Sequence, residues 1–511
     1  MPSVPRSHNY ENSPRSTRAE SGSLVPDRYT PQVIDHLVRP RKAGKIANPS
    51  GRGESGHEAC GDVASFTVSI SDNVLDEVRY GVYGCAACVA AGSALSELVE
   101  GRHIVEAARI SKADIQDALG GPLPLGKEHA LTLVLDALHK AFEDHWNQTA
   151  GELLMNGMST GGGAGRSVVA AMSGGVDSAV TALLLEEAGY DVVTVTFRLH
   201  DGEKGSRSCC SPDTVLFARD TAHRMGLPHF TLNLKELFDR RVMRDFVGSY
   251  QEGRTPNPCV ACNAHVKFHA SAFLADQLGY HHVATGHYAR VEEGPTLGRP
   301  ADRSKDQTYV LWPVPQDLLA RTVFPLGDHT KTEVRAIAEE RGLAVAYTPE
   351  SQDICFIPDG NYRRFVRKKV EAEPGDVVDR EGQVLGRHGG VVDFTVGQRR
   401  GIGVSAPTPL YVTEVRPSSG QVVVGRKTAL EVREVMVTDL NRFLDIGDAA
   451  CVQVRYNSQP VPCTVEETAD GAWKARLHEP VMGVAPGQSA VFYTADGSRV
   501  VGGGVVARRA A

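Results

Sequence analysis

The sequence contains no apolar run of the roughly 18 residues that a helix needs to cross a bilayer. It also lacks a Gly-x-y period, although it has 52 glycines and 28 prolines, so the chain is neither collagen-like nor disordered throughout. Residues 1–27 contain no apolar segment typical of a signal peptide, and they are too acidic for an ordinary transit peptide. We therefore expect a globular protein of the cytoplasm, with no membrane partner.

The sequence has fewer basic than acidic residues: 55 Lys and Arg against 62 Asp and Glu, which gives a net charge of −7. This balance argues against a generally basic nucleic-acid binder and against a DNA partner, so RNA binding would require a local basic face. Cysteine is also too sparse and too clustered for a secreted disulfide scaffold. The ten cysteines are Cys60, Cys85, Cys88, Cys209, Cys210, Cys259, Cys262, Cys355, Cys451 and Cys463.

The composition changes several times along the 511 residues, a length that predicts about two to four domains. A run of small residues at 157–165, mostly glycine, is typical of a flexible linker. The predicted parts are a disordered tail (1–28), an N-terminal α+β domain (29–147), the Gly-rich linker (148–166), an α/β domain (167–372), a central β domain (373–432) and a C-terminal β-barrel domain (433–511).

Strands and helices are predicted to alternate after the linker, which is typical of a doubly wound parallel α/β sheet. The predicted strands are Ser167–Ala171, Asp191–Phe197 and His281–Thr285, and the predicted helices are Ala179–Ala188, Thr214–Met225 and Lys331–Arg341. From about residue 375, short Val-rich alternating runs between Gly and Pro turns predict small β domains. These runs are Gln383–Leu385, Gly390–Phe394, Leu410–Val415, Gln421–Val424, Ala450–Arg455 and Ala490–Tyr493.

A Gly-rich loop follows the first predicted strand of the α/β domain. Its two glycines allow backbone amides to approach a phosphate, and the helix N-terminus after them adds a partial positive charge. Ser173 and Ser178 add hydroxyl donors, and Asp177 can hold a Mg²⁺ ion on the phosphates. The loop lacks the lysine of a Walker P-loop, and an ordinary strand-to-helix turn is the alternative. The loop residues are Ala171, Met172, Ser173, Gly174, Gly175, Val176, Asp177 and Ser178.

A second group of cysteines comprises the C-x-x-C pair Cys259 and Cys262 and the distant Cys355. Such a pair outside a secreted scaffold binds metal or is redox-active more often than it is structural. No second C-x-x-C or His pair completes a four-ligand zinc site. The three thiols fit either a persulfide and disulfide relay or a three-cysteine iron–sulfur site, with inert buried cysteines as the remaining alternative.

Six motifs occur in order: S-G-G-V-D-S (173–178), T-P-N-P with C-N (255–263), A-T-G-H-Y (284–288), K-D-Q (305–307), I-C-F-I (354–357) and G-Q-R-R-G (397–401). The first of them resembles the PP-loop ATP site of adenylating enzymes. Together they resemble the tRNA-specific 2-thiouridylases from about residue 167 to the C-terminus. The resemblance implies that ATP adenylates the 2-carbonyl oxygen of the wobble uridine of tRNA, and that sulfur then displaces AMP.

The same resemblance implies roles for individual residues. Cys262 is the implied nucleophile and Cys355 the implied persulfide carrier, while Asp177 serves the ATP reaction with Mg²⁺. Phe197 and Gly286 join the loop in binding ATP. The residues implied for the target base or the tRNA are Asn257, Pro258, Cys259, Lys305, Asp306, Gln307, Arg455 and Tyr456.

This chain has Cys259 where many 2-thiouridylases have aspartate. Three thiols are therefore available, and we hypothesise a [4Fe–4S] cluster on Cys259, Cys262 and Cys355. The rival is a persulfide on Cys355 that Cys262 resolves, without a cluster. Cys209 and Cys210 are candidates for a spare redox pair, and Cys451 and Cys463 are expected to fill the core of the β domains.

The N-terminal domain carries a third set of ligand residues, Cys60, Asp62, Cys85 and His129. Coming from three loops, they suit a tetrahedral zinc or [2Fe–2S] site, against the alternative of incidental thiols. The motifs Y-T-P-x-V-I-D-H (29–36), R-P-R (39–41), A-C-G-D (59–62) and Y-G-C (83–85) resemble the U-type, NifU-like iron–sulfur scaffold over residues 29–146. The resemblance implies that these four residues bind a metal or a cluster.

That family usually has another cysteine directly after the histidine, where this chain has Ala130. Cys88 lies one helical turn after Cys85 and is expected to substitute for it, because residues at i and i+3 share a helix face. Without such a substitute, the domain would hold or pass a cluster without building one.

Basic residues follow Cys355 and indicate a local RNA-binding face, although such a run is usually just a solvated helix surface. They are Arg363, Arg364, Arg367, Lys368, Lys369, Arg399 and Arg400, with Arg455 further on. We expect the anticodon loop of tRNA as one partner and a cysteine desulfurase or another sulfur donor as a second.

The whole chain is predicted to be a scaffold that a flexible linker tethers to a tRNA-thiolating enzyme, so that cluster or sulfur is delivered at high local concentration. The alternatives are a cluster carrier with an inactive thiolase half and a PP-loop ligase acting on a small molecule.

Overall fold

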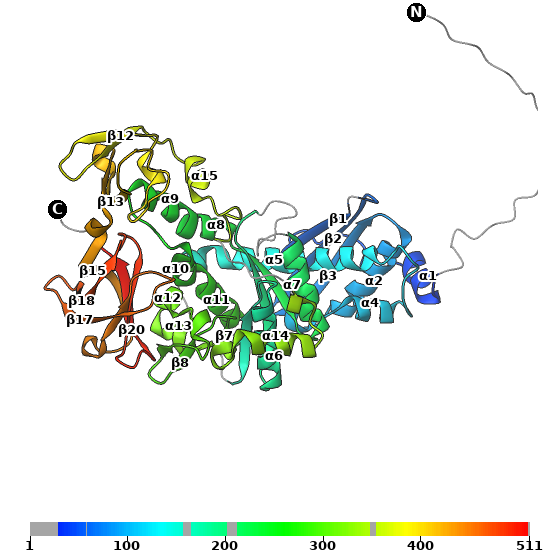
Figure 1. Cartoon of the computed structure of the whole chain (residues 1–511). Helices are drawn as coiled ribbons and strands as arrows, with labels where there is room; N and C mark the ends of the chain where they lie inside the picture. Colours follow the sequence, from blue (N-terminus) through cyan, green and yellow to red (C-terminus); the bar gives the residue numbers. More distant parts are fainter. Residues whose placement is uncertain (1–28, 58, 157–164, 202–211, 348–353, 509–511) are drawn as a thin grey trace, which may run out of the picture.

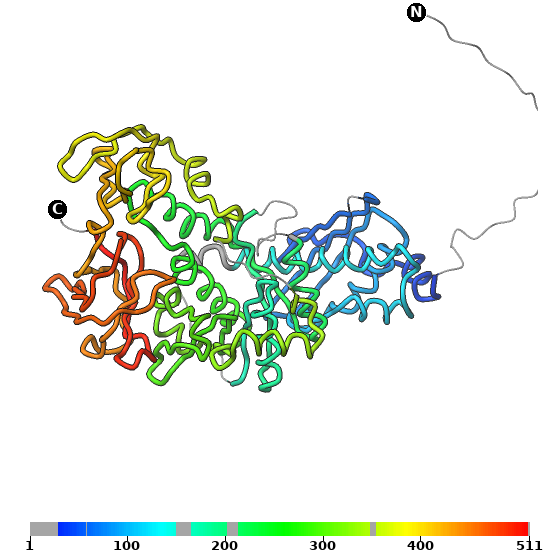
Figure 2. The backbone as a smooth tube through the Cα atoms, viewed as in Figure 1, coloured from blue at the N-terminus to red at the C-terminus, as the bar shows by residue number. Residues whose placement is uncertain are grey.

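The structure is a computed structural model that describes residues 29–57, 59–156, 165–201, 212–347 and 354–508 (Figure 1). The predicted tail, most of the glycine run and the pair Cys209 and Cys210 lie outside these ranges. Three bodies follow one another across the molecule: the N-terminal domain, the central α/β domain, and the two β domains side by side at the far end (Figure 2). None of the helices within the described ranges combines the length and the apolar character that crossing a membrane requires.

The N-terminal domain is a three-stranded antiparallel sheet covered by helices, in the order β1-β2-β3. The long helix α5 packs directly on β1, since a Cβ atom at Gly51 or Gly53 would lie 2.1 Å from a backbone oxygen of α5. Its elements are α1 (Pro31–Val38), β1 (Gly51–His57), β2 (Asp62–Ser71), β3 (Val74–Tyr83), α2 (Ala86–Val99), α3 (Ile104–Ala107), α4 (Lys112–Ala118) and α5 (His129–Asn156). The glycines of β1 therefore allow a helix to approach the sheet at backbone distance.

The central domain is a five-stranded parallel sheet in the order β10-β7-β4-β5-β6. The chain moves outward from β4 to β6, returns to β7 and ends at β10, which confirms the predicted doubly wound sheet. Its strands are β4 (Ser167–Ala171), β5 (Asp191–Arg198), β6 (His229–Asn233), β7 (His282–Ala284) and β10 (Thr322–Val323). The direction of winding reverses between β4 and β7, where ligands of such sheets bind at the carboxyl ends of the strands.

Helices cover the central sheet, and the short helix α10 among them carries Cys259 and Cys262 (Figure 1). They are α6 (Val176–Glu187), α7 (Pro212–Arg224), α8 (Lys235–Phe238), α9 (Arg244–Gln251), α10 (Pro258–Cys262), α11 (Phe268–Leu278), α12 (Thr308–Leu311), α13 (Gln316–Ala320), α14 (Lys331–Glu340) and α15 (Tyr362–Arg367). A hairpin of β8 (Arg290–Glu292) and β9 (Thr296–Gly298) and the 3₁₀ turn η3 (Arg303–Lys305) lie between β7 and α12.

The C-terminal third forms a four-stranded sheet, β12-β11-β14-β13, and a closed six-stranded barrel, β15-β18-β17-β16-β19-β20, as the prediction of small β domains with a barrel requires. The sheet strands are β11 (Gly375–Val378), β12 (Val384–His388), β13 (Tyr411–Arg416) and β14 (Gln421–Gly425). The barrel strands are β15 (Glu431–Arg442), β16 (Cys451–Gln453), β17 (Val461–Glu467), β18 (Trp473–Met482), β19 (Ser489–Tyr493) and β20 (Val500–Val506).

One predicted strand is wrong. Residues 390–394 contain a 3₁₀ turn, η6 (Val391–Asp393), in which the amide of Phe394 donates to the carbonyl of Val391 at 3.1 Å. Val392 and Phe394 are still buried. The alternating pattern therefore predicted correctly which side chains are buried, but it did not predict the backbone conformation. Asp393 accepts a 2.9 Å hydrogen bond from Arg367 Nε of α15, a long-range contact that a local pattern cannot contain.

Candidate functional site

The Gly-rich loop leaves β4 and enters α6 with its backbone turned toward an open cradle. The amide of Ser173 donates to Ser178 Oγ at 3.1 Å, and that hydroxyl donates in turn to the carbonyl of Gly175 at 2.9 Å. Gly174 has a φ of 77°, in the left-handed region, and Gly175 is the N-cap of α6. The loop thus presents amides and a helix N-terminus, the combination that binds phosphates.

Gly286 of the A-T-G-H-Y motif closes the other side of the cradle. A Cβ atom there would lie 2.9 Å from the amide nitrogen of Ser178, so only glycine allows the segment after β7 to pass this close to the first turn of α6. Phe197, near the end of the adjacent strand β5, is buried. The structure therefore brings the predicted loop and Gly286 together, and places Phe197 on the neighbouring strand.

Asp177 is held by two residues that the sequence analysis did not assign. The ammonium of Lys331, at the start of α14, lies 2.7 and 2.8 Å from the two carboxylate oxygens. The hydroxyl of Tyr288 donates to the same carboxylate at 2.9 Å. Lys331 is buried with 9% of its surface exposed, and only the fold brings it here, because more than 150 residues separate it from Asp177. This cradle of amides with one buried ammonium fits the triphosphate of ATP.

The C-x-x-C pair lies on the short helix α10. Asn257 is the N-cap and accepts a 3.0 Å hydrogen bond from the amide of Cys259, and Pro258 is the first residue of the helix. Cys259 is exposed, whereas Cys262 is buried with 5% of its surface exposed. The rigid start of the helix therefore presents one thiol to solvent and turns the other toward the core.

Cys355 lies in a turn that an aromatic cluster anchors. The amide of Ile357 donates to the carbonyl of Ile354 at 2.8 Å, and the ring of Phe356 lies 5.0–5.7 Å from three other rings, which belong to Phe238, Phe246 and Phe365. Cys262 belongs to the same hydrophobic cluster, and Cys355 packs against it. No disulfide joins any two of the eight cysteines within the described ranges.

The K-D-Q motif holds the loops around α12 in place. The side-chain oxygen of Gln307 accepts a 2.8 Å hydrogen bond from the backbone amide of Tyr288. The backbone amide of Gln307 donates in turn to the carbonyl of Tyr288 at 3.1 Å. Asp306 pairs with Arg299 and accepts hydrogen bonds from Thr308. Lys305 is the last residue of η3. Two of the three predicted tRNA residues therefore position neighbouring loops.

The C-terminal barrel docks on the segment that precedes α10 (Figure 1). The amide of Thr255 donates to the carbonyl of Pro486 at 2.7 Å, and Trp312 Nε1 donates to Ser489 Oγ at 2.9 Å. A Cβ atom at Gly487 would lie 2.9 Å from Cβ of Arg254. The barrel therefore forms one wall beside the helix that carries the two thiols.

Tyr456, which connects the barrel strands β16 and β17, reaches the same region. Burial raises the pKa of Tyr456, and the negative charges of Cys259 and Asp306 raise it further. Arg455 donates to the carbonyl of Met482 at 2.6 Å and to that of Gly483. The predicted residues Cys259 and Asp306 thus interact electrostatically with Tyr456, whereas Arg455 braces the barrel.

A basic pocket of about 670 Å³ opens between α15 and the four-stranded sheet. Arg367 pairs there with Asp393, and Arg364 pairs with Asp359. Its basic lining residues are Arg363, Arg364, Arg367, Lys368 and Arg387. The predicted local basic face therefore takes the form of a pocket, although the whole chain is acidic.

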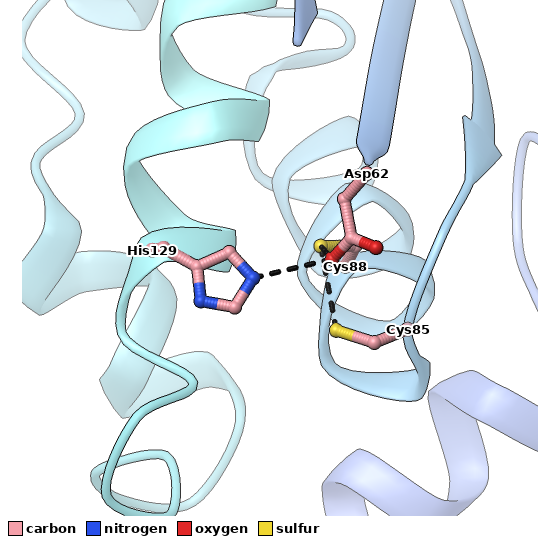
Figure 3. Close-up of side chains that lie close together, drawn as sticks. All are labelled: Asp62, Cys85, Cys88 and His129. Atoms are coloured by element: carbon pink, nitrogen blue, oxygen red, sulfur yellow. Dashed lines mark hydrogen bonds and ion pairs between the residues drawn. The ribbon is translucent and has the colours of Figure 1, made fainter. Parts of the chain in front are cut away.

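The N-terminal ligand set meets where three elements begin (Figure 3). Asp62 opens β2, Cys85 is the N-cap of α2 with Cys88 in its first turn, and His129 opens α5. One ligand atom from each of these four residues lies within 4.8 Å of every other. Cys60 is exposed and lies beside them, with Sγ 3.6 Å from His129 Nε2. The structure therefore adds Cys88 to three of the four predicted ligands.

The local charges of this site are set by burial and by hydrogen bonds. Burial alone would raise the pKa of Asp62, but hydrogen bonds from His129 and the nearby thiols outweigh it and hold the pKa well below its usual range. Burial raises the pKa of the Cys88 thiol, and the hydrogen bond to Asp62 raises it further. The carboxylate is thus a buried anion surrounded by potential donors.

Four families match successive parts of the chain. They are described as NifU-like N terminal domain (residues 28–151), tRNA methyl transferase HUP domain (166–359), tRNA methyl transferase PRC-barrel domain (363–426) and Aminomethyltransferase beta-barrel domain (437–506). A protein of Rubrobacter xylanophilus called bifunctional protein NifU/MnmA is 71% identical over 95% of this chain and 100% of its own length. The chain belongs to the bifunctional NifU/MnmA family.

The part of the chain after the NifU-like domain, called here the thiolase part because it resembles the 2-thiouridylases, has further relatives that lack the NifU-like domain. The tRNA-specific 2-thiouridylase MnmA of Carboxydothermus hydrogenoformans is 44% identical over 67% of this chain and 98% of its own length. That of Rhodospirillum centenum is 47% identical over 67% of this chain and 91% of its own length. Both expected resemblances, to the NifU-like scaffolds and to the 2-thiouridylases, are confirmed.

In this NifU/MnmA protein the two halves are packed together, and not only tethered. Trp146 and Phe142 of α5 meet Phe230 of β6, with ring centroids 5.9 and 6.3 Å apart. All three side chains are almost fully buried. The helix α5 also runs to Asn156, into the segment 148–166 for which composition predicts a linker. The predicted tether is therefore not the sole connection between the described parts of the two halves, because aromatic burial packs α5 on the central sheet, and most of the glycine run lies outside the described residues.

Polar contacts fix the orientation of the NifU-like domain on the thiolase domain. Glu143 pairs with Arg198 at 2.9 Å, and Asp136 pairs with the buried Arg219 at 3.2 Å. Three histidines lie buried nearby, His139 of α5, His223 of α7 and His229 of β6. Burial, aided by Arg219, lowers the pKa of each, to about 4 for His223. The interface is thus built around neutral imidazoles.

Proposed function

We propose that the chain catalyses ATP-dependent 2-thiolation of the wobble uridine of tRNA, with its NifU-like domain supplying cluster or sulfur. The observation that carries this proposal is the glycine-lined cradle in which Lys331 and Tyr288 hold Asp177. Its amides and buried ammonium suit the phosphates of ATP. The relatives that match residues of this domain are called tRNA-specific 2-thiouridylases, which supports tRNA as the substrate.

In the first step the 2-carbonyl oxygen of the uridine attacks the α-phosphorus of ATP, and pyrophosphate leaves. The loop amides, Ser173 and Lys331 stabilise the negative charge that builds up on the phosphates. Asp177 keeps free lone pairs beside its hydrogen bonds and is the residue we assign to Mg²⁺. The adenylated oxygen is then a good leaving group at carbon 2.

In the second step sulfur replaces that oxygen. The outer sulfur of a persulfide on Cys355 attacks carbon 2 of the base, and AMP leaves with the oxygen. The thiolate of Cys262 then attacks the inner sulfur of Cys355, so that a Cys262–Cys355 disulfide forms and 2-thiouridine is released. The burial of Cys262 and the half-buried position of Cys355 limit the access of water to both sulfurs, which supports this relay. A thiol reductant must then restore both cysteines.

The cluster hypothesis for Cys259, Cys262 and Cys355 has less structural support. Within the described residues, the group of ligand atoms close enough to hold a metal ion is the N-terminal one, and these three thiols are not part of it. An iron-free protein that is fully active would exclude the cluster, whereas anaerobic preparations with stoichiometric iron at these cysteines would restore it.

Binding of tRNA is assigned to the surface around α10 and the basic pocket. Tyr456 is 44% exposed beside Cys259 and offers a ring on which an unstacked base can lie. An anticodon loop lowers the cost of flipping the uridine into the site, because its bases are not paired. Arg363 and Arg387 line the pocket where backbone phosphates are expected to bind. This activity places the protein in the cytoplasm, together with its tRNA and sulfur donor.

The decisive experiment measures AMP release by the purified full chain on addition of unmodified tRNA and a persulfide donor such as a cysteine desulfurase. Mass spectrometry of the same tRNA reports 2-thiouridine. We expect wild type to form both products, Cys262→Ser to form AMP without 2-thiouridine, and Cys451→Ser, a barrel cysteine, to match wild type. No AMP release on addition of tRNA would overturn the proposal.

A further inference from the structure

Five potential ligands surround one point in the NifU-like domain, which is one more than a tetrahedral metal needs. Asp62, Cys85, Cys88 and His129 point toward one another (Figure 3), and their ligand atoms all lie within 4.8 Å. Cys60 lies at the rim and is exposed to solvent. Which four of the five bind the metal decides how the site works.

Three of the distances among the four inner residues are close to those of tetrahedral ligands. Zinc bonds of about 2.0–2.3 Å to N, O and S place neighbouring ligand atoms about 3.3–3.8 Å apart. The two thiols, Cys85 Sγ and Cys88 Sγ, are 3.6 Å apart. Asp62 Oδ2 lies 3.2 Å from Cys88 Sγ and 3.2 Å from His129 Nε2. These three distances therefore suit ligands of one tetrahedral ion.

Cys88 is placed to bind a metal ion, whereas residue 130 is not. Ala130 is fully buried in the body of α5 and has no ligand atom. Cys88 lies one helical turn after Cys85, and its backbone amide donates to the carbonyl of Cys85 at 3.0 Å. The first turn of α2 thus points both thiols at the same spot.

Cys60 is held differently. Its thiol lies 3.2 Å from Nδ1 of His57 as well as 3.6 Å from His129 Nε2, and the two imidazole rings are 4.9 Å apart. It follows β1 in an exposed turn, whereas each of the other four residues opens, or lies in the first turn of, a helix or strand. It also falls outside the group of four mutually close ligand atoms.

We propose that Asp62, Cys85, Cys88 and His129 form a complete four-ligand site for a divalent tetrahedral metal such as Zn²⁺, and that Cys60 is not required for it. Two thiolates, one carboxylate and one neutral imidazole close the metal from all sides. Cys60 then remains an exposed thiol beside an already loaded site. This assignment rests on the proposed scaffold role of the domain, but metal binding itself does not depend on thiolation of tRNA.

The first test is thiol footprinting on the wild-type full chain, which requires no variant. The protein is stripped with a chelator, divided, and reloaded or not with one equivalent of Zn²⁺ before brief alkylation and peptide mass spectrometry. We expect Zn²⁺ to protect the half-buried Cys85 from alkylation while the exposed Cys60 stays reactive, and the fully buried Cys88 is examined in the second test. Protection of Cys60 by Zn²⁺ would overturn the proposal.

The second test replaces Zn²⁺ with Co²⁺, whose absorption spectrum reports tetrahedral geometry and thiolate ligands. We expect Cys88→Ser to lose tetrahedral absorption and to weaken metal binding by more than the roughly 10- to 100-fold that changes around a ligand cost. Cys60→Ser is expected to keep both, as is the barrel control Cys451→Ser. Loss of the site in Cys60→Ser, with retention in Cys88→Ser, would contradict the assignment.

AMP release with tRNA is measured on the same samples. A Cys88→Ser protein that loses metal but still releases AMP separates the metal site from the thiolase reaction. A protein that keeps the metal site but never releases AMP would overturn the proposed function and leave this site standing. The two failures are therefore distinguishable.

Discussion

The two cysteine sites of this chain are built in opposite ways. In the NifU-like domain, four ligands from β2, α2 and α5 converge in one domain and lie within 4.8 Å of one another. In the thiolase domain, Cys262 is buried on α10 and Cys355 lies half-buried in a later turn, and neither belongs to the group of mutually close ligand atoms found among the described residues. The first arrangement suits holding a metal, and the second suits passing sulfur between thiols. Similar residues therefore acquire different chemistry from their spacing in the fold.

The metal-ligand set also lies at the opposite end of α5 from the contact with the central sheet. His129 opens α5, whereas Glu143 of the same helix pairs with Arg198 at the carboxyl end of β5, the edge of the sheet where the ATP loop lies. At 1.5 Å per residue, these two positions on α5 are about 20 Å apart along the helix.

The largest effect is expected at the nucleophile of the thiolase site. Cys262→Ser should lower 2-thiouridine formation by more than about 10³-fold, because serine does not attack a persulfide sulfur at neutral pH. The metal content of the NifU-like domain should not change. Metal analysis and tRNA mass spectrometry on one preparation check both expectations. Parallel loss of metal would show that the two sites are coupled.

The next effect is expected at the ATP cradle. Lys331→Met removes the ammonium that lies against Asp177 and should slow AMP release by about 10²–10³-fold, the loss typical of one preorganised electrostatic donor. Lys474→Met, a surface lysine of the barrel, is the matched control. Initial rates of AMP release with saturating tRNA provide the measurement. A rate within twofold of wild type would remove Lys331 from the ATP site.

The interface between the two halves provides the third test. Trp146→Ala removes a side chain that is 1% exposed and should cost about 3–5 kcal/mol of unfolding free energy. Phe230→Ala should cost a similar amount, and the double variant should cost less than the sum because the two rings are in contact. Urea unfolding followed separately in each domain checks this. Strict additivity would mean that the rings do not interact across the interface.

The same interface predicts a dependence of stability on pH. Burial lowers the pKa of His223 to about 4 in the folded protein, against about 6.5 in the unfolded chain. The unfolded state therefore binds protons first as the pH falls below about 6.5, and stability is lost progressively down to about pH 4. At pH 5 this single histidine should cost on the order of 2 kcal/mol relative to pH 7.5. Urea midpoints of wild type and His223→Gln, which should respond less to pH, check the sign.

The smallest effect is expected at the basic pocket. Arg364→Ala should weaken tRNA binding a few-fold and lower the salt dependence of the affinity by about one released counterion. Arg433→Ala, which lies outside the pocket lining, should leave both unchanged. Binding titrations at several salt concentrations provide the measurement. An unchanged salt slope in Arg364→Ala would move the tRNA phosphates away from this pocket.

Local patterns predicted much of the fold. The strand Ser167–Ala171 has the bounds of β4, and the Val-rich runs correspond to strands of the sheet and the barrel except at residues 390–394. The alternation of hydrophobic side chains reports burial, and burial occurs in strands and in anchored turns alike. Contacts with distant residues distinguish a strand from an anchored turn. The hydrogen bond from Arg367 to Asp393 is such a contact, and a short stretch of sequence around residue 393 does not contain Arg367.

The sequence by itself determined the chemistry that this protein carries: the glycine loop, the C-x-x-C pair and the N-terminal ligand motifs are local, and local spacing sets what a loop or a helix turn can bind. Only the tertiary structure decided which residues complete these sites. Lys331 reaches Asp177 and Trp146 meets Phe230, whereas Cys88, which helix spacing had already predicted as a substitute ligand, lies against Asp62. Each pair is far apart in sequence, so only the packing of elements sets its distance. The same packing adds a buried interface to the predicted tether.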